Sequence, residues 1–294
     1  MISASQLGEY ARRAIYLAIY GLFAILPMDK ASAFGSWIAR QIGPRLRVNR
    51  LARRNIEQAL PDESPEDVDA ILTEMWDNLG RVCGEFPHIG RLDIYNDTRI
   101  EVVGAEHIDV MRDDGKPGIF FTPHVGNWEL SAYTVMQRGF LSNIAVVYRA
   151  PNDPAAEWLL KIGRKHLQAE LIPKGSAGAR RILEILRTGG HVGVLPDQKM
   201  NDGISVPFFG RPAMTAPAAA QLALKFGCTI LPGRVVRLDG ARFRIIVDPP
   251  IPLPNSGDRR ADVAALTTTL NQVMETYIRE HPGQWLWVHR RWPD

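Results

Sequence analysis

After about residue 100, the sequence alternates short apolar runs with stretches of helical periodicity, and this alternation most restricts the fold. The apolar runs have four to eight residues, the length of buried strands. They fall at 118–122, 143–148, 169–172, 191–195, 229–236 and 243–247, and the helical patterns fall at about 128–138, 153–168, 176–188 and 216–226. Strands that alternate with helices form a largely parallel sheet flanked by helices, so we predict an α/β fold.

Two further patterns complete the expected architecture. The dipeptide Asp239-Gly240 separates the last two apolar runs and is typical of a hairpin turn, so we expect these two strands to be antiparallel. A long amphipathic helix is expected at about 259–280. Another begins near Ser64, which suits the cap of a helix that Pro65 starts. The sequence has no internal repeat and no linker long enough to separate two domains.

An uncharged run at residues 14–26 is the most apolar part of the N-terminal region. It has thirteen residues, whereas a membrane-spanning helix needs roughly 20. A secretory signal is one alternative, because a basic pair precedes the run and Ala31-Ser32-Ala33 imitates a cleavage site. An ordinary buried helix is another. Six arginines between Arg40 and Arg54 argue against secretion, since basic residues that follow an apolar segment tend to stay in the cytoplasm. We therefore predict a helix that lies in a membrane surface or dips into it.

The basic excess is concentrated at one end of the chain. Residues 1–54 contain nine basic and two acidic residues, a net charge of +7; the whole chain has a formal charge of +3, so the other 240 residues carry −4. We predict a basic membrane-anchoring helical segment at 1–54, which binds anionic lipid, and an α/β domain at 55–294. No nucleic-acid partner is indicated, and nothing in the sequence indicates an oligomeric state. Cys83 and Cys228 fit a reducing compartment and form no disulfide or zinc pattern.

The residues that follow the strand at 118–122 have the best pattern for a catalytic pair, because ligand-binding groups gather at the carboxyl ends of parallel strands. His124 and Glu129 are five positions apart, about 140° around a regular helix, so they converge only where a helix begins between them. Gly126 suits a turn and Asn127 suits an N-cap. A carboxylate that fixes the imidazole tautomer lets the other ring nitrogen accept a proton from a substrate hydroxyl. The alternative is a histidine satisfied by backbone groups beside a helix-start acid.

The segment HVGNWE at 124–129 resembles the His-x4-acid motif of the glycerolipid acyltransferase superfamily. In this form it is most similar to the lipid A late acyltransferases, the lauroyl and myristoyl transferases of lipopolysaccharide synthesis. Four other blocks resemble segments of that family in the same order: VYRAPND at 147–153, LPDQ at 195–198, VPFFG at 206–210 and WLWVHRRW at 285–292. The resemblance therefore covers nearly the whole chain.

The resemblance implies a glycerolipid-acyltransferase-like fold and direct acyl transfer from a thioester to a hydroxyl, without a covalent acyl-enzyme. His124 would be the general base and Glu129 its partner. It also implies an acyl carrier protein thioester as donor, a lipid A precursor as acceptor, and a place on the cytoplasmic face of the bacterial inner membrane, with no metal and no cofactor. The sequence has no GxSxG nucleophile motif, which agrees with this mechanism, and we expect Ser176 to be a helix cap.

Nine further residues are candidates for substrate binding. Arg149 follows a strand and suits a phosphate or the charge that develops on a thioester oxygen; the alternative is a surface ion pair. Asp197 suits the orientation of Arg149 or the binding of an acceptor sugar; the alternative is a turn residue. Phe208 and Phe209 line an acyl channel or belong to the core, and Arg291 faces lipid phosphates or packs on the domain with the chain end. The full set is Arg149, Asn152, Asp197, Gln198, Phe208, Phe209, Gly210, Arg290 and Arg291.

Two competing functions stay open. One is an acyltransferase for another phospholipid or glycolipid; the branch that acylates glycerol phosphate typically has Asp at the position of Glu129, which favours lipid A. The other is a non-catalytic peripheral membrane protein whose basic N-terminal segment is the functional part. The six other histidines have no carboxylate at a comparable spacing, so we expect them to be structural or solvated. They are His88, His107, His166, His191, His281 and His289.

Overall fold

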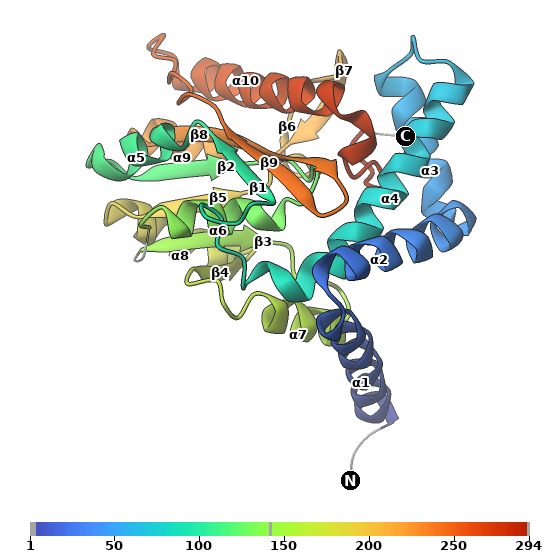
Figure 1. The fold of residues 1–294 in the computed structure, drawn as a ribbon. Coiled ribbons are helices and arrows are strands. Elements are labelled where there is room, and N and C mark those ends of the chain that lie inside the picture. The colour runs from blue at the N-terminus through green and yellow to red at the C-terminus, as the bar shows by residue number, and fades with distance from the viewer. Residues whose placement is uncertain (1–3, 141–142, 293–294) are drawn as a thin grey trace.

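A seven-stranded sheet forms the centre of the computed structural model, which describes residues 4–140 and 143–292 (Figure 1). The strand order is β1-β9-β8-β2-β5-β3-β4. The strands are β1 (Ile100–Val103), β2 (Gly118–Phe121), β3 (Ile144–Tyr148), β4 (Glu170–Pro173), β5 (His191–Val194), β8 (Thr229–Asp239) and β9 (Arg242–Val247). Only β8 and β9 pair antiparallel; the other neighbours are parallel. The predicted α/β fold with a largely parallel sheet and a final hairpin is confirmed.

Helices cover both faces of this sheet. They are α5 (Ala105–Asp113), α6 (Glu129–Gln137), α8 (Ser176–Arg187), α9 (Ala218–Phe226) and α10 (Arg259–Glu280), whereas α7 (Pro154–Gly163) lies beside the N-terminal helix. Strand β2 illustrates the two layers: Ile119 and Phe121 belong to the core cluster that includes residues of α8, α9 and α10, whereas Phe120 packs with residues of α5 and α6. Four of the predicted helices match α6, α8, α9 and α10 within two residues at each end; α7 ends five residues earlier than predicted.

A separate two-stranded hairpin, β6 (Ile204–Phe208) with β7 (Arg211–Thr215), was not expected from the sequence. Its two-residue turn places Phe209 and Gly210 at positive φ, 52° and 67°, as a type I′ turn requires. The sequence pattern is weak because Pro207 and Pro212 face each other across the pair, and proline normally argues against a strand. A hairpin outside the main sheet has free edges, where proline is tolerated. The strand β1 and the helix α5 were also not expected.

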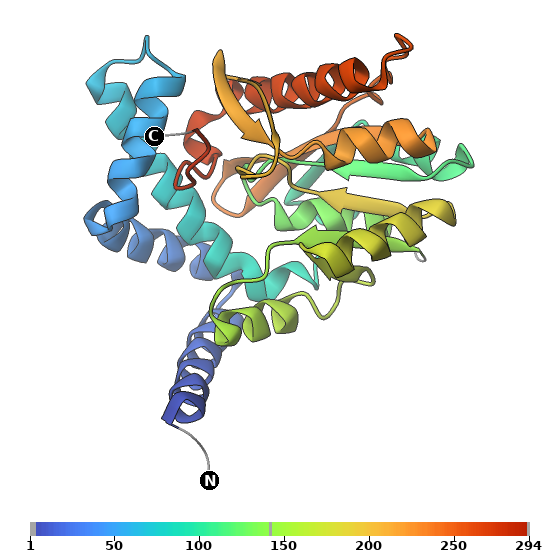
Figure 2. The same ribbon diagram turned by 180° about the vertical axis from the view of Figure 1, so that it is seen from behind.

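The N-terminal helices lie at the end of the sheet where β2 to β5 have their carboxyl ends. They are α1 (Ala4–Ile25), α2 (Met28–Ile42), the short 3-10 helix η1 (Gly43–Arg45), α3 (Arg47–Ala59) and α4 (Pro65–Ile89). Ser64 and Asp67 form the capping box that starts α4, which confirms the predicted helix start. Helix α1 points away from the sheet and packs against α7 (Figures 1 and 2).

Within the described part of the chain, no helix combines the length and the apolar character needed to cross a membrane. The predicted domain boundary at residue 54 falls inside α3, which spans Arg47–Ala59. The buried side chains of Ala52 and Ile56 join the core cluster that contains Ile119 and Phe121. Helix α3 therefore packs as part of the α/β body rather than as a free anchor.

Helices α2 and α4 cross with their backbones in contact. A Cβ atom on Gly35 would lie 2.1 Å from the carbonyl oxygen of Gly80, and one on Gly84 would lie 2.2 Å from that of Ala31. Only small residues allow such an approach, since any larger side chain would have to occupy the space of the partner backbone. This crossing fixes α2 against α4.

We therefore expect Gly35→Leu to lower the free energy of unfolding by about 1–3 kcal/mol, because overpacking forces the two backbones apart. Urea unfolding followed by circular dichroism measures this change. Gly21→Leu is the matched control, since nothing lies within 4 Å of a Cβ at that helical position. It should not lower the free energy of unfolding, and loss of a helical glycine should raise it by up to about 1 kcal/mol. Equal midpoints for the two variants would contradict the close crossing.

Candidate active site

The loops that follow four parallel strands, β2, β5, β3 and β4, meet at one edge of the sheet. They carry His124 after β2, Asp197 and Gln198 after β5, Arg149 after β3 and Lys174 after β4. Tyr148 is in register with Pro173, and the backbone N–H of Lys174 donates to the Tyr148 carbonyl at 2.9 Å. The next residues of the two strands, Arg149 and Lys174, are therefore neighbours. Sequence analysis found His124, Asp197, Gln198 and Arg149 but did not single out Lys174.

His124 is paired with Asp197. Its Nδ1 lies 2.8 Å from Asp197 Oδ1, and its backbone N–H donates to Asp197 Oδ2 at 2.8 Å. The indole Nε1 of Trp285 donates to Oδ2 as well, at 2.8 Å. The Asp197 side chain is 1% exposed and that of His124 is 15% exposed. With Nδ1 turned to the carboxylate, Nε2 is the ring nitrogen left to accept a proton.

Asp197 is held as a carboxylate in spite of its burial. Burial by itself raises the pKa of a carboxyl group, but the charge of the neighbouring His124 and the hydrogen bonds from His124 and Trp285 outweigh this effect. The result is a pKa well below the usual value for aspartate. An ionised carboxylate at Nδ1 is the arrangement that fixes the imidazole tautomer and stabilises the imidazolium.

Glu129, the expected partner of His124, is bound by Arg164 instead. Arg164 Nη2 lies 2.6 Å from Glu129 Oε1, and Arg164 Nε lies 2.9 Å from Oε2. The loop turns at Gly126, whose φ is +57°, and Glu129 then begins α6. His124 consequently faces the loop after β5, whereas Glu129 faces the end of α7. Sequence spacing could not reveal a partner that lies 73 positions away.

The N-caps expected from sequence also differ in the structure. Trp128 occupies the N-cap position of α6, and Asn127 donates its side-chain N–H to Glu85 at 2.7 Å. Gly175 occupies the N-cap position of α8, where Ser176 is the first helical residue. In both cases the polar residue lies one position from the cap that its sequence suggested, which is within the usual uncertainty of helix ends.

His289 lies beside His124, although sequence analysis treated it as structural or solvated. The two ring centroids are 5.9 Å apart, and Nε2 of His289 is 3.1 Å from Nε2 of Gln198. Burial and the nearby charge of His124 lower the pKa of His289 to about 4, so it is neutral at physiological pH. The neutral ring accepts the hydrogen bond that the Gln198 amide donates. The sequence feature that pointed to His289 is its position inside the WLWVHRRW block at 285–292.

Of the remaining candidate residues, Arg149, Asn152 and Arg290 are exposed. Phe208 and Phe209 are 0% and 6% exposed and pack in the core with Trp285, Trp287 and Trp292, and Gly210 is part of the hairpin turn. Arg291 is fully buried, over the Phe208 ring, and donates to the Met214 carbonyl and the Thr215 hydroxyl. The structure therefore places the two phenylalanines and Arg291 in the core. For each of them, packing in the domain was the alternative to substrate binding that the sequence left open.

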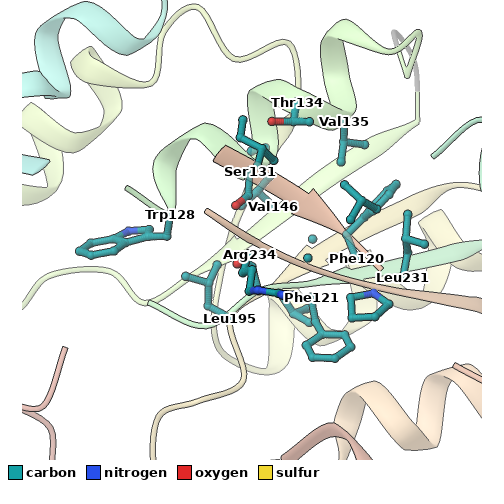
Figure 3. A pocket seen from close by; sticks show the side chains of 18 of the residues that line it. Phe120, Phe121, Trp128, Ser131, Thr134, Val135, Val146, Leu195, Leu231 and Arg234 are labelled. Atoms are coloured by element: carbon teal, nitrogen blue, oxygen red, sulfur yellow. The ribbon is translucent and has the colours of Figure 1, made fainter. Parts of the chain in front are cut away.

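An apolar pocket lies between α6 and the sheet (Figure 3). Trp128 stands at one end, in edge contact with the His124 ring at 5.1 Å between centroids, and Phe120, Leu231 and Val135 lie towards the other end. Its lining contains three charged residues, Glu129, Arg164 and Arg234. The pocket thus joins the catalytic edge to the apolar interior.

Known proteins are similar to this chain over most of its length. The family model described as bacterial lipid A biosynthesis acyltransferase matches residues 3–294. The lipid A biosynthesis palmitoleoyltransferase of Escherichia coli K12 is 25% identical over 284 residues, which is 94% of this chain and 89% of that protein. The lauroyltransferase of the same organism is 26% identical, with 82% and 78% covered. A phosphatidylinositol mannoside acyltransferase of Mycobacterium tuberculosis H37Rv is 23% identical, with 97% and 88% covered.

The pairing of His124 with Asp197 has a consequence for stability. Because the pKa of Asp197 is depressed in the folded protein, its contribution is present above the unfolded pKa of about 4 and is lost as the pH falls below it. We expect Asp197→Asn to cost about 1–3 kcal/mol at pH 7, and the gap from wild type to shrink below about pH 4. Urea unfolding at a series of pH values measures the gap.

Asp202→Asn is the matched control, because Asp202 is exposed in a turn. Its stability should stay within about 0.5 kcal/mol of wild type at every pH. If the gap for Asp197→Asn were constant from pH 7 to pH 3, Asp197 would not be the ionised partner of His124.

Proposed function

Because this chain belongs to the bacterial lipid A biosynthesis acyltransferase family, we propose that it transfers a fatty acyl chain from an acyl carrier protein thioester to a hydroxyl of a lipid A precursor. The observation that carries the proposal is the His124–Asp197 pair next to an apolar pocket. Among the described residues no hydrogen bond engages Nε2 of His124, so this nitrogen is available to a substrate hydroxyl. The site thus combines a histidine that suits a base with an apolar pocket beside it.

In the proposed reaction, His124 Nε2 takes the proton of the acceptor hydroxyl while the hydroxyl oxygen attacks the thioester carbonyl carbon. Asp197 holds the imidazole through Nδ1 and stabilises the imidazolium that forms. The tetrahedral intermediate collapses with cleavage of the C–S bond, and the imidazolium returns its proton to the leaving thiolate. An ester and a free thiol result, and the protein ends in its starting state.

Glu129 has a different part in this proposal from the one its motif suggests. Its carboxylate is 11% exposed and is bound by Arg164, which is 13% exposed, at the pocket wall. The indole N–H of Trp128 also donates to Glu129 Oε1, at 3.2 Å. We assign to Glu129 the placement of Trp128 and of the start of α6, beside the imidazole, rather than direct contact with His124.

The cationic residues Arg149 and Lys174 suit the anionic groups of both substrates. They lie next to each other at the carboxyl edge, and Lys174 is close enough to Asp197 for the two charges to interact. In this proposal Arg149 makes bidentate hydrogen bonds to a phosphate, and Arg149 and Lys174 together stabilise negative charge on a thioester oxygen. The phosphate is that of the glycolipid or of the phosphopantetheine arm.

The apolar pocket suits the acyl chain. Its lining from Trp128 towards Val135 is predominantly aliphatic and aromatic (Figure 3), and burial of a methylene group is worth about 0.8 kcal/mol. In this proposal the chain lies under α6, and the core residues Phe208 and Phe209 do not touch it.

A second acceptor class has support from one observation. The mycobacterial relative that covers 97% of this chain is named for phosphatidylinositol mannoside, a different glycolipid. Acylation of another glycolipid is therefore the alternative. The third hypothesis, a peripheral membrane protein without catalytic activity, does not fit a chain that belongs to a family of acyltransferases.

The acceptor and the donor chain are lipids, and we propose that residues 1–54 hold the enzyme on the cytoplasmic face of the inner membrane. Large apolar side chains are exposed there, with Ile25 79% and Trp37 55% exposed. Exposed arginines, among them Arg45, Arg47 and Arg50, lie on the adjoining η1 and α3. Apolar side chains beside basic ones suit a helix on anionic lipid, where each basic residue is worth about 1 kcal/mol.

The function is tested with purified enzyme, acyl carrier protein thioesters and a lipid A precursor, with the product identified by mass spectrometry. We expect an added acyl chain with wild type. His124→Ala and Asp197→Asn should each lower kcat by about 10²- to 10⁴-fold, because they remove the base or its orientation. His166→Ala, at an exposed histidine, is the control and should retain full activity.

In parallel, lipid A from a strain that lacks the gene should carry fewer acyl chains than lipid A from the parent. An unchanged acyl count, together with transfer to another glycolipid in vitro, favours the second acceptor class. Full activity of His124→Ala would overturn the mechanism for both acceptors.

Membrane binding is measured by co-sedimentation with vesicles of neutral or anionic phospholipid. The double variant Arg47→Gln/Arg50→Gln should bind anionic vesicles about 30-fold more weakly, the equivalent of two basic residues at about 1 kcal/mol each. Arg180→Gln/Arg187→Gln removes the same charge from exposed positions of α8 and should bind like wild type. Equal loss in both variants would mean that only the net charge of the protein matters.

A further inference from the structure

A fully buried carboxylate lies behind the catalytic loop. Glu85 of α4 is 0% exposed and accepts four hydrogen bonds. Arg237 donates from Nη1 at 2.5 Å and from Nη2 at 3.0 Å, Ser32 donates its hydroxyl at 2.6 Å, and Asn127 donates its side-chain N–H at 2.7 Å. A buried charge is tolerated only when it is paired and hydrogen-bonded in this way. Each of these donors is therefore held firmly.

The donors to Glu85 come from three different parts of the fold. Arg237 belongs to β8, Ser32 belongs to α2, and Asn127 belongs to the loop that carries His124. Ser32 and Asn127 are both 0% exposed, so both bonds are shielded from bulk solvent. One carboxylate thus joins the N-terminal helices, the sheet and the catalytic loop.

A second set of bonds holds the residue before Asn127. Arg237 Nε donates to Asn78 Oδ1 at 2.9 Å, and the side-chain N–H of Asn78 donates to the Gly126 carbonyl at 3.0 Å. The backbone N–H of Gly126 donates to the Gln284 carbonyl at 3.0 Å, while Gln284 Oε1 accepts from the backbone N–H of Arg237 at 2.8 Å. Both peptide groups of Gly126 are therefore engaged by residues that contact Arg237.

The backbone of Gly126 is constrained both by its conformation and by close packing against a neighbouring strand. Its φ of +57° is in the left-handed region, and a Cβ there would lie 2.0 Å from the carbonyl oxygen of Val235. His124 is two residues away. A shift of Gly126 or Asn127 consequently moves the imidazole relative to Asp197, and a misplacement of about 1 Å is enough to cost about 100-fold in rate.

We propose that Glu85 is a positioning residue for His124, and that its bond to Ser32 makes the position of the catalytic loop depend on helix α2. Helix α2 thereby acts on catalysis from within the basic N-terminal segment, in addition to any contact with lipid. The expected effect on catalysis rests on the proposed acyl transfer, whereas the expected effect on the position of the loop does not depend on any activity.

Two serines of α2 provide a matched pair of variants. Ser32 and Ser36 are 0% and 1% exposed, and each donates to a carboxylate of α4. The partner of Ser36 is Asp77, which also binds Arg81 and Arg40. Among the described residues, Asp77 has no hydrogen bond to the loop at 122–128. Each variant removes a serine-to-carboxylate hydrogen bond between the same two helices, and Ser32→Ala also removes a 3.3 Å bond from Arg81 Nη1. Of the two serines, only Ser32 touches the carboxylate that holds the loop.

The experiment compares wild type, Ser32→Ala, Ser36→Ala and Asn127→Ala. Unfolding in urea first establishes that all four proteins are folded; Glu85→Gln is avoided because it would leave Arg237 charged and unpaired in the interior. Hydrogen exchange of the segment 122–130 then reports on the loop without any substrate. Steady-state kinetics with thioester and acceptor separate kcat from KM.

We expect faster exchange at 122–130 in Ser32→Ala and Asn127→Ala, with the Ser36→Ala loop like wild type. The value of kcat should fall about fivefold in Ser32→Ala and about 100-fold in Asn127→Ala, with KM changed less than about twofold. Identical exchange and identical kcat for the two serine variants would overturn the inference. If wild type transferred no acyl chain to any acceptor, the proposed function would fail, and the exchange data would still decide whether Glu85 positions the loop.

Discussion

The buried carboxylate of Asp197 needs hydrogen-bond donors, and the arrangement of the active site follows from how the chain supplies them. The donors are the ring and the backbone N–H of His124 and the indole of Trp285. They come from the loop after β2 and from the C-terminal segment, whereas Asp197 follows β5. Because an ionised group without partners is very costly in the interior, these segments must meet at one point. At that point Nδ1 of His124 faces the carboxylate, the arrangement on which its proposed role as a base depends.

The same loop is held from its other side by a second buried carboxylate. Asp197 binds His124 at the start of the loop, and Glu85 binds Asn127 three residues later. Between them, Gly126 has the positive φ that turns the chain from the strand to α6. His124 therefore lies in a short segment with fixed points at both ends, which is the preorganisation that its proposed role as a base requires.

Local sequence patterns predicted most of the strands and helices of the main sheet and several residues at the ends of its strands. Apolar runs and helical periodicity gave the parallel sheet, the last hairpin and most of its helices, and the rule that ligands bind at carboxyl ends of strands gave His124, Asp197, Gln198 and Arg149. The partner of His124 could not be found in this way, because spacing along the chain says nothing of a contact between residues 124 and 197. His289 was missed because its contacts with His124 and Gln198 also join residues that are far apart in the sequence. The hairpin at 204–215 was missed because its paired prolines mask the strand pattern.

The aromatic residues near the C-terminus have a consequence for how the protein is made. Trp285, Trp287 and Trp292 are nearly or fully buried, and Arg291 fills the core beside Phe208. Asp197 also lacks its indole donor until Trp285 is present. During synthesis, the helices of residues 4–59 and the sheet emerge long before these side chains. The core is therefore completed, and Asp197 gains its indole donor, only after residues 285–292 have been translated.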